Sequence, residues 1–333
     1  MKKIKFCFLI ICSENYIQET VGLVRNINKF YPNYKVFVIS LDLTTEKQLL
    51  KFLKEKVIVI SGEKIWGESF FKNIECRMST PEIAYATKAA AAYYLIKKYT
   101  DSLLILDADL LILEQIDDII KSVKKSDVTL ISANRDLIDW RRSNDIGLFS
   151  AGVIGFSKKS IKGLHWWKSE CFNHTNINIF FGNYYEQKFL DYFVLNYNIK
   201  LIKDIGINLS STFLKKAQPF FDVKKNKWLT DSGVPIRIFH QSRVTNHEIY
   251  KLKNIYLQDF NSKIKSSEIK QKKIIQIDKV INYLRNILGS IIYIFIYLKR
   301  ILCQRKYNYL YAFRETFIRK KKLINFIKGE TND

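Results

Sequence analysis

Apolar runs alternate with helical periodicity through the first part of the chain. Nearly continuous apolar runs at 3–12, 35–43 and 56–61 predict strands, and the segments 16–31 and 44–55 between them repeat apolar positions at helical spacing. Thr44 or Thr45 is the expected N-cap of the second helix. Strands that are apolar on both faces and alternate with helices are typical of a parallel sheet covered on both sides. The pattern therefore predicts an α/β fold.

A well-marked helix and a fourth strand follow. The segment 61–78 has no regular period, so we expect a loop over the sheet. Thr80 is the expected N-cap of the next helix, because Pro81 suits its first position and Glu82 the positive end of its dipole. Further strands are predicted at 102–107, 127–134, 147–157, 199–204 and 235–240, and further helices at 81–99, 160–173 and 183–197.

Two carboxylates, Asp107 and Asp109, stand inside the apolar stretch SLLILDADLLIL at 102–113. Burying an unpaired carboxylate is unfavourable, so either the strand ends at a surface turn or the two carboxylates share a cation. Ligands of open α/β sheets bind at the carboxyl ends of the strands, which favours the shared cation. Oxygen ligands suit Mg²⁺ or Mn²⁺, and either ion can neutralise the charge of a departing nucleoside diphosphate.

The composition fits a globular protein in a reducing compartment. The chain has 333 residues, of which 47% are hydrophobic. Its five cysteines are odd in number and lack C-x-x-C spacing, which argues against a disulfide framework or a zinc knuckle. The first twelve residues are basic and then apolar, like a signal peptide. The apolar run is short and no small-residue cleavage site follows it, so we expect a buried first strand.

The net charge of +23 is concentrated towards the end of the sequence. Residues 261–333 contain 17 Lys and Arg against 5 Asp and Glu, which indicates an acidic partner. The segment 261–273 is polar and charged, like a linker. A twelve-residue apolar run at 287–298 follows, between Arg285 and Lys299. A membrane-spanning helix needs about 20 apolar residues. We therefore expect a helix that lies in the plane of an anionic membrane surface.

Five segments, in order, carry a resemblance to a known family. They are ATKAAAAYYLIKKYTDSLLILDADLLIL at 86–113, GLFSAGVIGF at 147–156, YYEQKFLDYF at 184–193, KDIGINLSSTFL at 203–214 and PIRIFHQS at 235–242. They resemble the motifs of GT-A-fold nucleotide-sugar glycosyltransferases, especially retaining family 8 and its bacterial relatives. The resemblance spans about residues 1–245. It implies a mixed central sheet flanked by helices in a GT-A-like domain over 1–255, followed by a linker and a basic, amphipathic, membrane-attaching helical extension over 256–333.

The resemblance also implies an activity and a set of site residues. The expected reaction transfers a sugar from a nucleoside diphosphate, most simply UDP, to a bacterial surface glycan such as lipopolysaccharide or capsule, with retention of anomeric configuration. Asp107, Asp109 and His240 would bind Mn²⁺ or Mg²⁺. The donor would contact Ser13, Asn15 and Tyr16 at the base and ribose, Asp107 at the ribose, Lys88 at the diphosphate, and Ser150, Ala151 and Gly152 along the sugar, with Glu186 and Gln187 beside the anomeric carbon.

The same resemblance, together with the basic extension, predicts partners and a location. The expected partners are a nucleotide-sugar donor, a glycan or lipid-linked glycan acceptor and an anionic membrane surface, with no nucleic acid. The expected location is cytoplasmic, peripherally attached to the inner face of the cytoplasmic membrane.

Two positions depart from the family pattern. Ser150 stands where Asn is usual, and Glu186 where Asp is usual, so the positioning of the sugar is in question more than donor binding. Three residues keep a second interpretation. Lys88 could be a solvated lysine on its helix, His240 a surface histidine and Gln187 a capping residue.

Three other protein classes are alternatives to this hypothesis. A haloacid-dehalogenase-type phosphohydrolase also carries Asp-x-Asp after an apolar strand, but its motif needs Thr or Val where this chain has Leu111. A nucleotidyltransferase needs a glycine-rich loop after the first strand, and IICSENYIQET contains no glycine. A basic nucleic-acid-binding protein is the non-enzyme alternative, with ample Tyr and Phe for stacking. Basic residues beside an apolar run favour a lipid surface instead.

Overall fold

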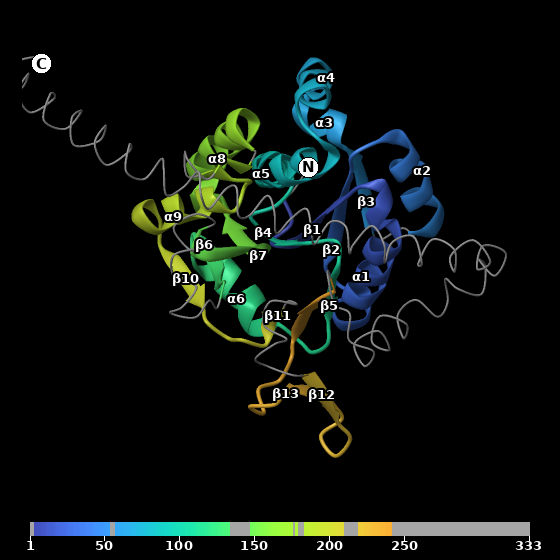
Figure 1. Cartoon of the computed structure of the whole chain (residues 1–333), viewed down its shortest axis with the longest axis vertical. Helices are drawn as coiled ribbons and strands as arrows, with labels where there is room; N and C mark the ends of the chain where they lie inside the picture. Colours follow the sequence, from blue (N-terminus) through green and yellow to red (C-terminus); the bar gives the residue numbers. More distant parts are fainter. Residues whose placement is uncertain are drawn as a thin grey trace, which may run out of the picture. The chain divides into compact units, whose positions relative to one another are not determined.

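Seven strands form the central sheet, in the order β10-β6-β7-β4-β1-β2-β3. The computed structural model describes residues 3–53, 57–133, 147–175, 177–178, 183–209 and 219–241 (Figure 1). The strands are β1 (Cys7–Cys12), β2 (Lys35–Ser40), β3 (Val57–Ser61), β4 (Ser102–Leu106), β6 (Val128–Ser132), β7 (Phe149–Ser157) and β10 (Ile199–Ile202). Neighbouring strands are parallel except at β7, which is antiparallel to both β4 and β6. The sheet is therefore mixed, as the family resemblance implied.

Helices cover both faces of this sheet (Figure 1). On one face lie α5 (Thr80–Lys98) and α8 (Ile161–His174), and on the other α1 (Ile17–Phe30) and α6 (Asp117–Lys125). Alternate residues of a strand point to opposite faces, so a continuous apolar run supplies both cores. In β1, Cys7, Leu9 and Ile11 pack on the α5 side, and Phe8, Ile10 and Cys12 on the α1 side. The prediction of a buried first strand is confirmed.

A second, three-stranded sheet begins directly after β4. Its order is β11-β14-β5, with β5 at Leu110–Ile112, β11 at Ile207–Leu209 and β14 at Ile238–His240. Strand β14 is parallel to β11 and antiparallel to β5. Leu111, Leu209, Ile236 and Phe239 form its small core. Two short hairpins complete the strands, β8 (Ile177–Asn178) with β9 (Asn183–Tyr184), and β12 (Pro219–Asp222) with β13 (Lys227–Thr230).

Two helix starts differ from the sequence prediction by one to three residues. Helix α2 (Leu43–Phe52) is capped by Asp42, not by Thr44 or Thr45, because the Asp42 carboxylate accepts the N–H of Thr45 at 2.7 Å. Helix α5 is capped by Ser79, not Thr80. The backbone N–H of Ser79 donates to the Glu82 carboxylate at 2.8 Å, as in a capping box. In α2 the Asp42 carboxylate thus satisfies a free N–H of the first turn, and in α5 the Glu82 carboxylate satisfies the N–H of the capping residue itself.

Two larger predictions were wrong in part. The predicted loop at 61–78 is helical, with α3 (Gly62–Trp66) and α4 (Glu68–Arg77) separated by Gly67 at φ 88°. The predicted helix at 183–197 begins instead as β9, and only α9 (Asp191–Asn196) is α-helical, after a 3₁₀ turn at Lys188–Leu190. Tyr185 has φ 46°, a left-handed conformation that an α-helix cannot contain.

The remaining elements complete the described chain. Short 3₁₀ helices lie at Glu14–Tyr16 and Lys158–Ser160. Within the described ranges, no helix is long and apolar enough to cross a membrane. The predicted extension over 256–333, with its apolar run at 287–298, lies outside the described residues.

Candidate metal and donor site

The site lies where β1 and β4 end at the same edge of the central sheet. Ile10 of β1 is in register with Leu106 of β4, so the residues that follow these two strands reach one edge together. Asp107 follows β4, and its N–H donates to the carbonyl of Gly152 on β7 at 2.9 Å. After β1 come Ser13, which is buried, and Asn15 and Tyr16, which are exposed. The topology thus places these predicted donor-binding residues at the edge that carries Asp107.

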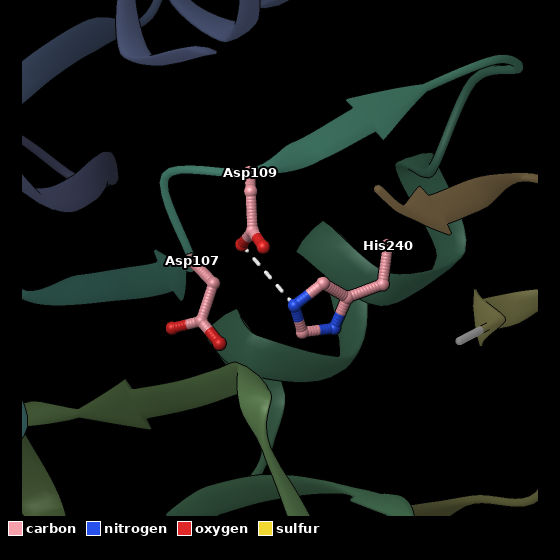
Figure 2. Close-up of side chains that lie close together, drawn as sticks. All are labelled: Asp107, Asp109 and His240. Atoms are coloured by element: carbon pink, nitrogen blue, oxygen red, sulfur yellow. Dashed lines mark ion pairs between the residues drawn. The ribbon is translucent and has the colours of Figure 1, made fainter. Parts of the chain in front are cut away.

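Asp107, Asp109 and His240 converge from two sheets (Figure 2). One ligand atom from each lies within 4.8 Å of the others, and His240 Nε2 is 3.1 Å from Asp109 Oδ1. The convergence follows from strand pairing, because His240 of β14 is in register with Leu110 of β5. The Gln241 N–H also donates to the Asp109 carbonyl at 2.9 Å. Two carboxylates and an imidazole are a donor set that can bind a divalent cation.

The imidazole and the carboxylate stabilise each other's charge. Burial disfavours the imidazolium, but the hydrogen bond and charge of Asp109 outweigh it and raise the pKa of His240. Burial likewise opposes ionisation of Asp109, yet the hydrogen bond from His240 lowers the pKa of this carboxyl. A cation at this position would compete with the imidazole proton, since a metal ligand must be deprotonated.

Lys88 brings a positive charge into the buried side of the site. Its Nζ lies 2.6 Å from Asp107 Oδ1 and 2.7 Å from Glu186 Oε1, and donates to the Ala151 carbonyl at 3.3 Å. Only 4% of Lys88 and 2% of Glu186 are exposed. Burial disfavours the ammonium, but the two carboxylates outweigh it and raise the pKa of Lys88. The interpretation of Lys88 as a solvated lysine is therefore wrong.

Glu186 occupies the end of this charged network. Burial raises the pKa of Glu186, although the charge of Lys88 opposes the shift. The backbone around it is fixed from the other side, because Trp167 Nε1 donates to the Glu186 carbonyl at 3.1 Å. The left-handed φ of Tyr185, immediately before it, turns the chain so that the carboxylate faces α5. The side chain predicted beside the anomeric carbon is thus held by Lys88.

The predicted sugar-binding segment of β7 adjoins these charges. The Ala151 N–H donates to Gln187 Oε1 at 3.4 Å, and the Gly152 N–H donates to Ser150 Oγ at 3.3 Å. A side chain on Gly152 would crowd the site, since an added Cβ would stand 2.9 Å from Asn208 Oδ1 and 3.2 Å from Asp107 Oδ2. The close approach of the Asn208 amide therefore favours glycine there.

Asn208 belongs to the site and was not predicted from the sequence. Its Oδ1 lies 3.1 Å from His240 Nδ1, and its Nδ2 donates to Ser150 Oγ. It therefore links the histidine to the segment of β7 predicted to bind the sugar. Asn208 has φ 60°, a left-handed conformation that asparagine adopts more readily than most residues. Its one sequence signal was its place in DIGIN, within the segment that resembles the family pattern.

Comparison with known proteins gave one sequence relative and several structural ones. No protein-family model matches the chain. YfnF, an uncharacterized protein of Bacillus subtilis (strain 168), is 20% identical over 261 residues, which cover 75% of this chain and 85% of YfnF.

The structural relatives include the glycosyltransferase LgtC. An active-site mutant of LgtC aligns with a TM-score of 0.51 and 14% identity, over 74% of this chain and 94% of LgtC. A second LgtC structure, described as a galactosyltransferase with donor and acceptor sugar analogues, aligns with a TM-score of 0.46 and 16% identity. The alignment covers 70% of this chain and 86% of that LgtC chain. The predicted fold is confirmed. The described part of the chain has the GT-A-like fold of the glycosyltransferase LgtC.

Proposed function

We propose that the chain is a metal-dependent glycosyltransferase that moves a sugar from a nucleoside diphosphate, most simply UDP, to a glycan acceptor. The observation that carries this proposal is the convergence of Asp107, Asp109 and His240 at the carboxyl edge of a GT-A-like sheet. LgtC, described as a galactosyltransferase, was solved with donor and acceptor sugar analogues, which supports the same two substrate classes here.

Asp107, Asp109 and His240 would hold the cation. Mn²⁺ is the first candidate because one ligand is an imidazole, and Mg²⁺ is the second. A bound divalent cation would neutralise the charge that develops on the leaving diphosphate. Lys88 would keep the Asp107 carboxylate oriented, and its ammonium would support the diphosphate end of the donor. Ser13, Asn15 and Tyr16 would bind the base and ribose, at the edge where β1 ends.

The donor sugar would lie along Ser150, Ala151 and Gly152, with Glu186 and Gln187 beside its anomeric carbon. Because Glu186 is paired with Lys88, it would act on the sugar as a carboxylate whose position is fixed. We infer retention of anomeric configuration from the family resemblance. In that case the acceptor hydroxyl attacks from the face that the diphosphate leaves.

The proposed acceptor rests on the family resemblance, and the proposed location on the charge of the chain. We propose a bacterial surface glycan, such as lipopolysaccharide or capsule, or its lipid-linked precursor. The basic residues of 256–333 would attach the protein to anionic lipid on the inner face of the cytoplasmic membrane.

A panel of nucleotide sugars tests the proposed activity directly. Full-length protein is expected to release UDP from at least one UDP-sugar when Mn²⁺ or Mg²⁺ is present, because water can replace the acceptor at low efficiency. EDTA should stop the release, and added Mn²⁺ should restore it. Hydrolysis that continues undiminished in EDTA would contradict metal dependence, and the absence of turnover with every nucleotide sugar would contradict the transferase.

Asn208→Ala is expected to weaken Mn²⁺ binding by about 10- to 100-fold, which is the usual effect of losing a partner that orients a ligating histidine. Its Oδ1 is the group that holds His240 Nδ1 at 3.1 Å. Calorimetric titration with Mn²⁺ measures the change. Asn196→Ala is the matched control, because the Asn196 amide only donates to the Tyr192 carbonyl on exposed α9. Equal affinities in the two variants would remove Asn208 from the site.

A further inference from the structure

The hairpin formed by β12 and β13 exposes apolar side chains on both of its faces. Its strands pair from Pro219 with Thr230 to Asp222 with Lys227. Phe220 is 45% exposed and Phe221 is 42% exposed. Neighbouring residues of a strand point to opposite faces, so both faces of β12 present an aromatic ring to solvent. An isolated two-stranded hairpin is marginal in water, and large apolar side chains exposed together on one hairpin indicate an interaction site.

The turn of the hairpin is ordered and holds its lysines outward. Asp222 Oδ1 accepts the N–H groups of Lys224 at 3.0 Å and Lys225 at 3.1 Å, and Asn226 closes the turn with φ 51°. At the tip, Val223 is 81% exposed. Residues 219–230 contain three lysines against a single aspartate. Asp222 Oδ2 also lies 3.9 Å from Lys225 Nζ, and Lys227 Nζ pairs with Glu114 at 3.2 Å, so a net positive charge remains at the tip. The tip is therefore apolar and positively charged at once.

The base of the hairpin is fixed to the sheet that carries His240. Leu229 is only 3% exposed, and Trp228 packs against the small core that contains Leu209 and Phe239. The Ile236 N–H also donates to the Trp228 carbonyl at 2.8 Å. Figure 1 shows the hairpin extending beyond β11 and β14, away from the seven-stranded sheet. Whatever binds the tip is thereby held in a defined position relative to the metal site.

We propose that the β12–β13 hairpin is a membrane-docking element that inserts its tip into an anionic lipid surface. Phe220, Phe221 and Val223 enter the interface between headgroups and acyl chains, and the lysines meet the headgroups. Charge favours this partner over a second copy of the chain, because two proteins of net charge +23 repel each other. The docking is separate from the proposed extension at 256–333. It needs no sugar donor, so its test is independent of the proposed transferase activity.

A fluorescent label on the tip tests the insertion in the full-length chain. The label is NBD, attached at Val223→Cys after Cys76→Ser and Cys303→Ser. Burial leaves Cys171 unreactive and raises the pKa of Cys7 and Cys12 to about 12. The control carries the label at Leu195→Cys on α9, because Leu195 is 85% exposed and Val223 is 81% exposed. Vesicles of phosphatidylcholine with phosphatidylglycerol should shift the emission at 223 to the blue, and nitroxide-labelled lipid should quench it. Neither effect should occur at 195.

Neutralisation of the two tip lysines tests the electrostatic part. Each lysine near an anionic surface contributes roughly fivefold to the partition coefficient, so Lys224→Gln with Lys225→Gln should lower it about 20- to 30-fold. The control is Lys47→Gln with Lys51→Gln, which removes two exposed lysines from α2. It should change the partition coefficient less than about twofold. Co-sedimentation with the same vesicles at low salt measures both.

Three results would overturn the proposal. The first is equal emission and quenching at positions 223 and 195. The second is an equal loss of vesicle binding in the two double-lysine variants. The third is an emission shift at 223 that grows with protein concentration in the absence of vesicles, because this would identify a second copy as the occupant. UDP release measured on the same labelled protein reports separately on the transferase.

Discussion

Asp109→Asn is expected to lower metal-dependent UDP release by more than about 100-fold, because loss of a direct ligand should exceed the 10- to 100-fold cost of losing an orienting partner. The carboxylate of Asp109 lies 3.1 Å from His240 Nε2 and is one of the three groups that converge at the site. Asparagine has nearly the same volume but lacks the negative charge. The rate should be measured with whichever UDP-sugar the wild-type protein hydrolyses, over a range of Mn²⁺ concentrations.

The control for this variant comes from the other end of the same strand. Asp101 precedes β4, and its carboxylate is 3.5 Å from Lys158 Nζ in an exposed ion pair. Asp101→Asn should retain the wild-type rate and the wild-type response to Mn²⁺. Thermal unfolding of both variants should resemble that of the wild type. If Asp109→Asn kept its activity, or regained it simply at higher Mn²⁺, Asp109 would not be a required ligand.

Lys88→Met is expected to destabilise the protein by about 3–5 kcal/mol, the usual cost of removing one partner from a buried ion pair. Methionine fills a similar volume, but it leaves Glu186, which is 2% exposed, without its cation. The double variant Lys88→Met with Glu186→Gln removes the unpaired charge and should recover much of the loss. The midpoint and the slope of the urea unfolding curve give the free energy of unfolding of each variant.

An exposed ion pair of the same length provides the control. Lys72 Nζ lies 2.7 Å from Glu68 Oε1, but both side chains are more than 60% exposed. Lys72→Met should leave the urea midpoint within experimental error of the wild type, since solvent already screens that pair. If Lys88→Met were as stable as Lys72→Met, the buried network at Lys88 would not exist in solution.

The sequence predicted the strands and most helices because their signal is local. Continuous apolar runs marked β1, β2, β3 and β4, which the sheet buries on both faces. Helices α3 and α4 were missed because Gly67 divides the segment into two short pieces, neither long enough to show a clear helical period. The β12–β13 hairpin was missed because PFFDVKKNKWLT has no two-residue Asn-Gly or Asp-Gly turn signal. Its four-residue turn depends on the Asp222 carboxylate and on the left-handed Asn226.

The site was predicted only as far as single residues could indicate it. Asp107 and Asp109 were identified by the contrast between carboxylates and their apolar neighbours. Asn208 was missed because its role depends on contacts with Ser150 and His240, which are 58 and 32 residues away in the sequence. The burial of Lys88 could not be predicted from the sequence either. Helix α5 has alanines around much of its circumference, so its sequence does not distinguish a buried face from an exposed one.

The buried network at Lys88 also constrains how the protein matures on the ribosome. Lys88 and Glu186 are 98 residues apart, so at roughly 5–20 residues per second Glu186 is synthesised about 5–20 s after Lys88. Strands β1 to β4 can pair during this interval, because each follows the previous one in sequence. Strand β7 and helix α8, which pack beside β4 and α5, are complete only when residue 174 has been made, late in this interval. For most of this interval the nascent chain therefore exposes the alanine-rich face of α5, and Lys88 lacks its Glu186 partner.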